Sequence, residues 1–392
     1  MTIIDSSIAA LQIELVERAR ALAPRLRERA EQAERDRTVP SESIAEILSA
    51  GLGGRMLTPA RFGGDELTLD AQYEVAVELG RGCASTAWVA TLLPHGCHMV
   101  GMFPEAGQQA VWADGPDPLI AASLPPAAKV ERVNGGYRIS GSHPFASGVD
   151  HATWVIVSGL VGGESGPVNH QFLVPRKDIR IDDTWFAAGM RATGSKTIVI
   201  DNVFVPEGHA CAGPTLIAGT AVGGTVNTNL LYRVPLAIHG GLTFIGPVIG
   251  AVRGAYEQFV ATSRERKTER GQLLAESEVV QEATGTVSAY IDAADALVRR
   301  GLHLARTCDP TTAEERAEAI RNYTQAGDFA VDAVDLMLEH SGTRAFMETH
   351  PLQRAWRDVH MMTSHIAFTR DNLTHFGRLA LGLDPDPKML IK

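Results

Sequence analysis

The hydrophobic pattern of this 392-residue chain changes twice, and this change limits the possible architectures more than any other feature. Residues 1–118 place apolar side chains at helical spacing, interrupted by short Pro- and Gly-containing loops. Residues 119–212 contain short β-branched and aromatic runs separated by glycine-rich turn signals. Residues 213–392 return to long amphipathic stretches, the last of them expected as a helix over residues 351–379. We therefore predict an α+β fold with an N-terminal helical domain, a middle β-barrel or sandwich, and a C-terminal helical bundle.

Composition and charge exclude several classes of protein. The chain is 45% hydrophobic, which is enough for a large core, and its net charge of −10 with no Lys/Arg block argues against nucleic-acid binding. The N-terminus lacks a basic region followed by an apolar run, so we expect no signal peptide. The stretch nearest to a transmembrane run, residues 234–252, is uncharged but contains Gly and Pro, and it is expected to be buried in the protein rather than in a membrane. Four cysteines without Cys-x-x-Cys spacing indicate reduced thiols in a cytoplasmic protein: Cys83, Cys97, Cys211 and Cys308.

Several local motifs occur in an order that resembles one superfamily. Residues 351–358, PLQRAWRD, resemble the P-x-x-R-x-x-R-D signature near the end of acyl-CoA dehydrogenases. Residues 189–195 (GMRATGS) and 201–206 (DNVFVP) are similar to a strand pair of that superfamily, and residues 143–148 (HPFASG) to its K-x-W-I-[ST]-N strand. Residues 265–271 (ERKTERG) resemble its E-R-x-x-F-G motif with one extra residue. The resemblance implies an acyl-CoA dehydrogenase-like fold whose C-terminal domain is a four-helix bundle.

The chain departs from the dehydrogenases at the position of their catalytic base. Many members carry a glutamate eight or nine residues past the Arg-Asp pair, where this chain has His365 and Ile366. Together with the F-A-S-G sequence at residues 145–148, this resembles the flavin-dependent monooxygenases of two-component systems. That group contains p-hydroxyphenylacetate hydroxylase oxygenase components, steroid phenol hydroxylases and dibenzothiophene monooxygenase. The resemblance implies that a separate NAD(P)H:flavin reductase supplies reduced FMN or FAD. The reduced flavin then reacts with O2 to give a C4a-hydroperoxyflavin. In agreement, the chain has no Gly-x-Gly-x-x-Gly strand–turn–helix motif for a nicotinamide cofactor.

The resemblance also suggests residues that contact the flavin. Ser147 matches the residue that faces flavin N5, although a strand serine can equally satisfy a backbone group. Ser123 matches a residue at the flavin or substrate face, and its alternative role is that of a turn serine. Arg191 and Ser195 are candidates to bind flavin phosphate or ribose, because guanidinium and hydroxyl groups suit phosphate oxygens. Arg266 matches a residue that reaches a flavin phosphate, often across a subunit contact.

Three histidines are candidates for proton transfer or substrate binding. Histidine ordinarily titrates near neutrality, so His365 is expected to deprotonate a phenol or to stabilise the hydroperoxide. The alternative is that His365 is a packed or surface residue. His95 and His98 follow Pro94 on a helix where related oxygenases place a phenol-binding histidine, and the sequence leaves open which one has this role. The His-x-x-His pair lacks carboxylate or cysteine partners that would complete a metal site, so we expect none.

These features favour an oxygenase component that hydroxylates a small aromatic, phenolic substrate. Two alternatives are an N- or S-oxygenating monooxygenase on the same scaffold and an acyl-CoA dehydrogenase whose base has moved to Glu257. A scaffold that has lost its flavin is the non-enzymatic alternative. The resemblance further implies a homotetramer, and neither nucleic acid nor membrane is expected as a partner.

Overall fold

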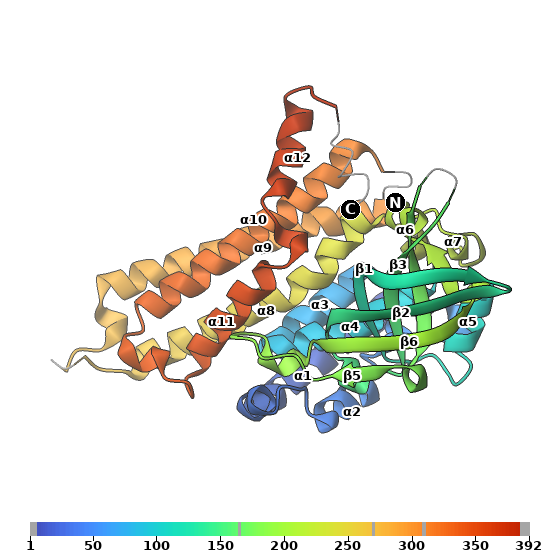
Figure 1. Cartoon of the computed structure of the whole chain (residues 1–392). Coiled ribbons are helices and arrows are strands. Elements are labelled where there is room, and N and C mark those ends of the chain that lie inside the picture. Colours follow the sequence, from blue (N-terminus) through green and yellow to red (C-terminus); the bar gives the residue numbers. More distant parts are fainter. Residues whose placement is uncertain (1–5, 164–165, 269–270, 308–310, 385–392) are drawn as a thin grey trace.

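The structure is a computed structural model that describes residues 6–163, 166–268, 271–307 and 311–384 (Figure 1). Two features of the sequence are not covered by these ranges. Cys308, one of the four expected thiols, lies outside the described residues, as do residues 269–270 of the segment similar to E-R-x-x-F-G.

Helices form the first part of the chain, as the helical spacing of its apolar residues predicts. They are α1 (Ser6–Asp36), α2 (Ser41–Ser49), α3 (Leu69–Gly80), α4 (Ala84–Val100) and α5 (Glu105–Val111). In α4 every residue except Leu92 is buried, because this helix packs against α3, β1 and α8. Gly96 permits the close contact with the sheet, since a Cβ atom at this position would lie 2.5 Å from the Cβ of Ile120. The central position of α4 makes it the scaffold of the site described below.

The middle of the chain forms one mixed seven-stranded sheet of order β5-β6-β2-β1-β3-β4-β7. Its strands are β1 (Ile120–Val133), β2 (Gly136–Ala146), β3 (Trp154–Val161), β4 (Val168–Pro175), β5 (Arg180–Asp182), β6 (Lys196–Pro206) and β7 (Ala210–Ala212). The strand β1 pairs in parallel with β3 up to Ala128 and antiparallel with β2 from Lys129 onward. The register shifts around Pro126, which has no N–H for the ladder, so β1 joins the two halves of the sheet at this point.

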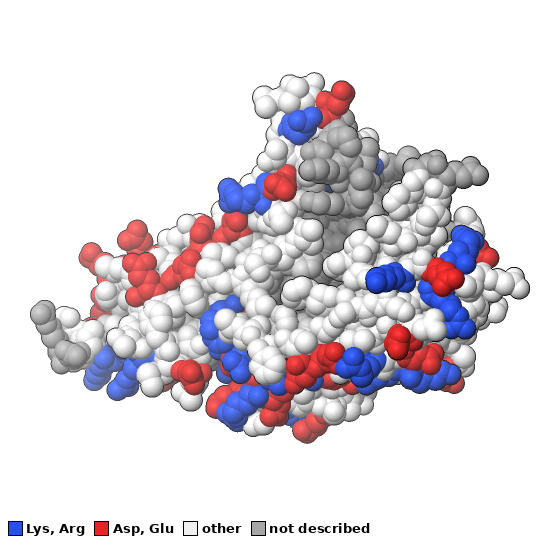
Figure 2. Space-filling view, viewed as in Figure 1, with Lys and Arg blue, Asp and Glu red and all other residues white. Residues whose placement is uncertain are grey.

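Helices return in the last part of the chain: α6 (Gly213–Ala218), α7 (Gly223–Val226), α8 (Leu236–Glu265), α9 (Glu278–Thr307), α10 (Ala313–Glu339), α11 (Pro351–Thr363) and α12 (Asp371–Ala380). The expected order of helices, sheet and helices is therefore confirmed (Figure 1). Helix α8 is long and apolar enough to cross a membrane, but 83% of its most apolar window is buried inside the protein, as expected of a core helix. On the face shown in Figure 2, carboxylates gather over α9 and α10 and charges of both signs cover the helices at the lower edge.

The continuous helix expected over residues 351–379 is wrong, because the chain leaves the helical path after Thr363. The hydroxyl of Thr363 donates to the carbonyl of Val359, and that of Ser364 to the carbonyl of Met361. Such side-chain bonds to the backbone compete with helix propagation. His365 then caps a short 3₁₀ turn, since its Nδ1 accepts the N–H of Ala367 at 3.2 Å. The break takes His365 off the helix surface on which the sequence pattern placed it.

The Arg-Asp pair of α11 holds the loop that leads into β6. Asp358 is 5% exposed, and its Oδ1 accepts the N–H of Met190 at 2.6 Å. Met190 has a left-handed backbone with φ of 52°, and the guanidinium of Arg357 donates to the carbonyl of Ala188. Gly189 is required between them, because a Cβ atom there would lie 2.4 Å from the carbonyl oxygen of Arg357. The two signature residues therefore set the path of the segment that follows.

We predict that Asp358→Ala and Asp358→Asn differ in stability although both remove the carboxylate. The alanine variant leaves the buried N–H of Met190 without its acceptor, which costs about 1–3 kcal/mol. The asparagine variant keeps an acceptor oxygen and removes only the charge. Urea unfolding at pH 8 measures both, and an asparagine variant as unstable as the alanine variant would contradict the assigned role.

The pH dependence of stability provides a second test of the same contact. Burial raises the pKa of Asp358 to about 6 from its ordinary value of 3.8. The folded state therefore binds more protons than the unfolded state between these values, and this carboxyl stabilises the fold less as pH rises through the window. We expect Asp358→Asn to show less loss of stability between pH 4 and pH 7 than the wild type, measured by urea midpoints.

Candidate functional site

Three side chains from distant parts of the chain meet around Trp88 of α4. The indole Nε1–H of Trp88 donates to the Oγ of Ser147 at 3.2 Å. Its ring centroid lies 5.0 Å from that of Phe244 on α8 and 5.9 Å from that of His365, and the Phe244 and His365 centroids are 4.1 Å apart. The structure thus brings together two predicted site residues, Ser147 and His365. The aromatic residues between them are marked by no sequence motif.

A chain of hydroxyl groups extends from Ser147 into the protein. Ser147 Oγ lies 2.7 Å from Ser195 Oγ, which lies 2.6 Å from Thr193 Oγ1. Thr193 donates to the carbonyl of Met190 at 2.8 Å, so it accepts from Ser195, and Ser195 accepts from Ser147. Ser147 thus donates its only hydroxyl proton to Ser195, and after accepting from Trp88 it keeps one lone pair that can accept a hydrogen bond from a bound ligand.

The backbone around Ser147 explains why its side chain faces this space. Strand β2 ends at Ala146, and the residues on either side of the Ala146–Ser147 pair have left-handed backbones, with φ of 63° at Phe145 and 72° at Gly148. The N–H of Gly148 donates to the carbonyl of Thr193 at 2.9 Å. This bond ties the turn to the loop held by Asp358, so both ends of the hydroxyl chain have fixed positions.

Two other candidate flavin contacts, Ser123 and Arg191, differ in whether their polar groups are already hydrogen-bonded. Ser123 is buried, and its hydroxyl donates to the carbonyl of Pro144 at 2.7 Å, which favours the structural alternative for this residue. Arg191 immediately follows Met190, and its Nε is buried without a hydrogen-bond partner among the described residues. Of the two, Arg191 is the side chain that still has a donor for an anionic ligand.

Arg266 lies far from the Trp88 cluster within the same chain. It is 22 residues beyond Phe244 at the end of α8, about 33 Å along a straight helix. Its guanidinium donates to the carbonyl of Ser341, and it lines a cavity of about 190 Å³ together with His340 and His350. The structure therefore does not bring Arg266 to the other predicted flavin residues of one chain.

His365 is a hydrogen-bond donor in its neutral form. Its Nδ1 accepts the N–H of Ala367, so the ring proton is on Nε2. Burial lowers the pKa of His365 to about 4, and the ring is neutral at pH 7. To act as a base it would have to accept a proton on Nδ1 and lose the bond to Ala367. Of the two expected roles, this arrangement favours donation of a hydrogen bond over deprotonation of a phenol.

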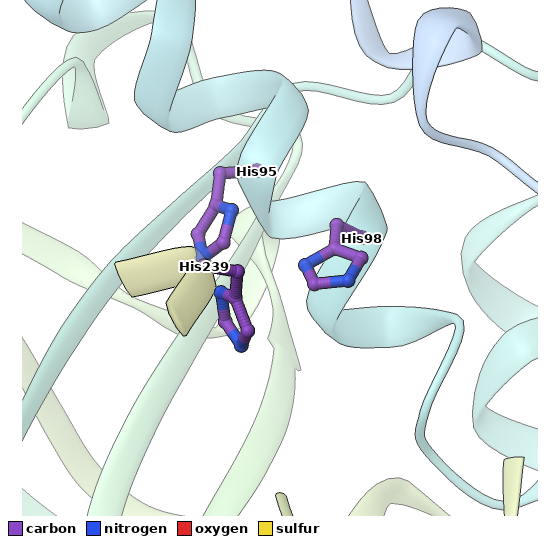
Figure 3. Close-up of side chains that lie close together, drawn as sticks. All are labelled: His95, His98 and His239. Carbon is purple, nitrogen blue, oxygen red and sulfur yellow. The ribbon is translucent and has the colours of Figure 1, made fainter. Parts of the chain in front are cut away.

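A second cluster of imidazoles lies further along the same pair of helices (Figure 3). His95 and His98 of α4 and His239 of α8 have ring centroids 4.7–5.2 Å apart, and all three are buried. His95 follows Trp88 by seven residues, about two helical turns and 10 Å, and therefore lies on the same face of α4. The Nδ1 of His95 contacts the Oγ1 of Thr243 at 3.1 Å, and the Nε2 of His98 donates to the carbonyl of Leu231 at 2.7 Å.

His239 and Thr243 are missing from the residues that the sequence marks as functional. They belong to α8, far from α4 in the sequence, and they occur in an apolar stretch without a motif. A histidine in such a stretch was the only available signal.

The acyl-CoA dehydrogenase alternative placed a base at Glu257, which the structure contradicts. Glu257 is 40% exposed and pairs with Arg81 at 2.7 Å and Arg27 at 3.5 Å. It lies 13 residues beyond Phe244 on α8, about 20 Å along the helix, so it cannot replace a carboxylate beside Trp88.

Comparison with known proteins connects this chain to one family. The family model "Acyl-CoA dehydrogenase, N-terminal domain" matches residues 10–114, and "Acyl-CoA dehydrogenase, C-terminal domain" matches residues 242–370. A pigment production hydroxylase of Rhodococcus sp. is 33% identical over 96% of this chain and 98% of its own length. The oxygenase component of an FADH2-dependent resorcinol hydroxylase of Rhizobium sp. is 32% identical over 95% of both chains. The structure of XiaF from Streptomyces sp. in complex with FADH2 and glycerol matches with a TM-score of 0.89 and 29% identity, covering 97% of this chain and 98% of that one.

We predict that His365 titrates near pH 4 and that Phe244 causes this low pKa. Phe244→Ala opens the space beside the imidazole, so the pKa of His365 rises toward its ordinary value of 6.5 as water regains access. Imidazole NMR signals followed against pH measure the shift, and the signal absent from His365→Asn identifies the residue. A native His365 that titrates above pH 6 would contradict the described burial.

Proposed function

We propose that this chain, which belongs to the acyl-CoA dehydrogenase superfamily, is the oxygenase component of a two-component flavin-dependent monooxygenase that hydroxylates a small phenolic compound. The observation that carries the proposal is that Ser147 and a partly buried, neutral His365 both contact Trp88. In the dehydrogenases the position of His365 is that of a carboxylate base, which this site does not need. The names of the resorcinol hydroxylase and the pigment production hydroxylase support the same reaction class.

The residues of the site fit a reduced flavin. When bound, the flavin supplies the two electrons that allow one oxygen atom of O2 to enter the substrate while the other leaves as water. The Ser147 hydroxyl, which donates to Ser195 and accepts from Trp88, has one lone pair left that could accept a ring N–H of a reduced flavin. The unpartnered Nε of Arg191 is available for a polar oxygen of the cofactor. FMN and FAD both satisfy these contacts.

The protein groups around the flavin would exclude water and position the substrate. Trp88 and Phe244 contact each other and form an apolar wall beside His365, whose Nε2–H is directed by the Ala367 contact. Of the two α4 histidines, His95 is the better candidate to meet a phenolic hydroxyl. It shares the face of Trp88, whereas His98 uses its Nε2–H on the carbonyl of Leu231.

The remaining parts of the proposal concern partners. A two-component oxygenase receives its reduced flavin from a separate reductase, and this chain has no nicotinamide motif of its own. The distance between Arg266 and the Trp88 cluster supports a role for Arg266 as a contact to the flavin of a neighbouring copy. Such a contact fits a homotetramer. Each subunit would have three domains, with boundaries near residues 118 and 212. We place this assembly in the cytoplasm, where the reductase partner would have NAD(P)H.

The reaction can be tested with photoreduced FMN or FAD mixed with oxygenated buffer and a panel of phenols, amines and thioethers. We expect a hydroxylated phenol that contains ¹⁸O from ¹⁸O2, with little hydrogen peroxide released. Ser147→Ala should increase the rate of peroxide release roughly tenfold, because it removes one hydrogen bond worth about 1.5 kcal/mol. Mass spectrometry and a peroxide assay measure the two products.

Ser140→Ala is the matched control, since it removes a serine hydroxyl from β2 at a site bonded only to the backbone N–H of Asn202. It should leave the peroxide fraction unchanged. Labelled amine or thioether products without phenol products would favour the N- or S-oxygenating alternative. Stoichiometric peroxide with every compound, or oxidation of acyl-CoA, would overturn the proposal.

A further inference from the structure

We propose that His95, His98 and His239 form a binding site for a divalent transition-metal ion such as Zn²⁺, which links α4 to α8. The site does not require the proposed oxygenase reaction, although it uses the Nε2 of His95, for which a phenolic substrate would compete. It requires only that three imidazoles from two helices present free lone pairs to one point, and the contacts around them indicate this arrangement.

The positions of the three rings are close to those of a three-histidine site. Each residue offers a ring nitrogen, and these nitrogens lie within 4.8 Å of one another. Zinc binds imidazole nitrogen at about 2.0–2.1 Å in a tetrahedron, which places neighbouring nitrogens about 3.3 Å apart. Side-chain rotations that move each ring nitrogen by about 1 Å would bring the nitrogens to the separation that zinc requires. Figure 3 shows the rings of His95 and His98 leaving adjacent turns of α4, beside His239.

Two of the imidazoles are held in the tautomer that a metal ligand requires. His98 donates Nε2–H to the carbonyl of Leu231, which leaves a lone pair on its Nδ1. Thr243 donates its hydroxyl to the carbonyl of His239 at 3.0 Å, so it accepts Nδ1–H from His95 and leaves a lone pair on the Nε2 of His95. Histidines that bind metals nearly always donate their second ring N–H to such a group.

The third imidazole lacks any partner. Both ring nitrogens of His239 are buried without a hydrogen bond among the described residues, and the Nδ1 of His98 is equally unpartnered. His239 is 1% exposed and His98 is 0% exposed, so bulk water does not compensate either ring. A buried polar atom without a partner costs about 1–3 kcal/mol. An ion bound between the rings would satisfy both residues at once.

The chemistry of the three ligands selects the class of ion. Burial lowers the pKa of His95, His98 and His239, so their rings are neutral and their lone pairs free at pH 7. Three imidazoles without a carboxylate suit Zn²⁺, Ni²⁺ or Cu²⁺ and do not suit Ca²⁺ or Mg²⁺, which prefer oxygen. The fourth position of a tetrahedral ion remains open for water or an anion. From the sequence we expected no metal site because the His-x-x-His pair lacks carboxylate or cysteine partners, and His239 lies far from this pair in the chain.

The test is zinc binding by the metal-free full-length protein, with ZnCl2 in equilibrium dialysis and elemental analysis. We expect one Zn²⁺ per chain that His239→Gln loses, with a fall in affinity of roughly 100-fold or more as a direct ligand is removed. Co²⁺ should give the intense visible absorption of a four-coordinate ion in the wild type and not in the variant. Thr243→Val removes only the group that orients His95 and should weaken binding by roughly 10- to 100-fold.

His303→Gln is the matched control, because His303 is an exposed histidine on α9 outside the cluster. It should bind zinc as the wild type does. Circular dichroism of each variant shows whether it is folded, and Thr243→Val retains all three ligands if His239→Gln fails to fold. No stoichiometric zinc, or zinc and cobalt binding that both variants retain, would overturn the proposal.

Discussion

The hydrogen bond between the carboxylate of Asp358 and the N–H of Met190 links the two halves of the candidate site. On one side of this bond, the loop after Met190 carries Thr193 and Ser195, which hold Ser147 through two hydroxyl contacts. On the other side, α11 continues from Asp358 for less than two turns and then releases His365 toward Trp88. One buried contact therefore sets the spacing between a serine of the sheet and a histidine of the bundle. A rigid spacing of this kind is what catalytic groups need, because small displacements weaken them strongly.

Burial has two different consequences along the α4–α8 interface. Near Trp88 it makes His365 a neutral donor, with its tautomer set by the backbone of Ala367. About 10 Å further along α4 it produces three neutral imidazoles, of which two have set tautomers and the third finds no hydrogen-bond partner in the described part of the chain. The same apolar surroundings thus support hydrogen-bond donation at one end and metal binding at the other. The two ends differ in how their ring N–H groups are used. His365 keeps its Nε2–H for a ligand, whereas His95 and His98 donate theirs to Thr243 and to the carbonyl of Leu231.

Much of the fold follows from the sequence, because helical and strand periodicities are local signals. Helices, sheet and helices occur in the expected order, but residues 189–195, expected as part of a strand pair, form a loop with a 3₁₀ turn at Arg191–Thr193 before β6. The break before His365 was missed because Thr363 and Ser364 end the helix through hydroxyl bonds, without Pro or Gly. The meeting of Ser147 with His365 was implied only by the resemblance, and the place of His239 was not predicted at all. Both depend on contacts between residues far apart in the chain, for which spacing and periodicity contain no information.

The dispersal of the site along the chain has a consequence for folding. Trp88, Ser147, Phe244 and His365 come from the first helices, the sheet, the core helix and the last helices, so every contact among them closes a long loop. Loop closure costs entropy before the contacts repay it, and such contacts form late. A chain still being synthesised, or one folded only in part, therefore has no assembled cluster. Recovery of the Trp88–Ser147 contact during refolding would report completion of the whole tertiary structure, which local helix formation does not.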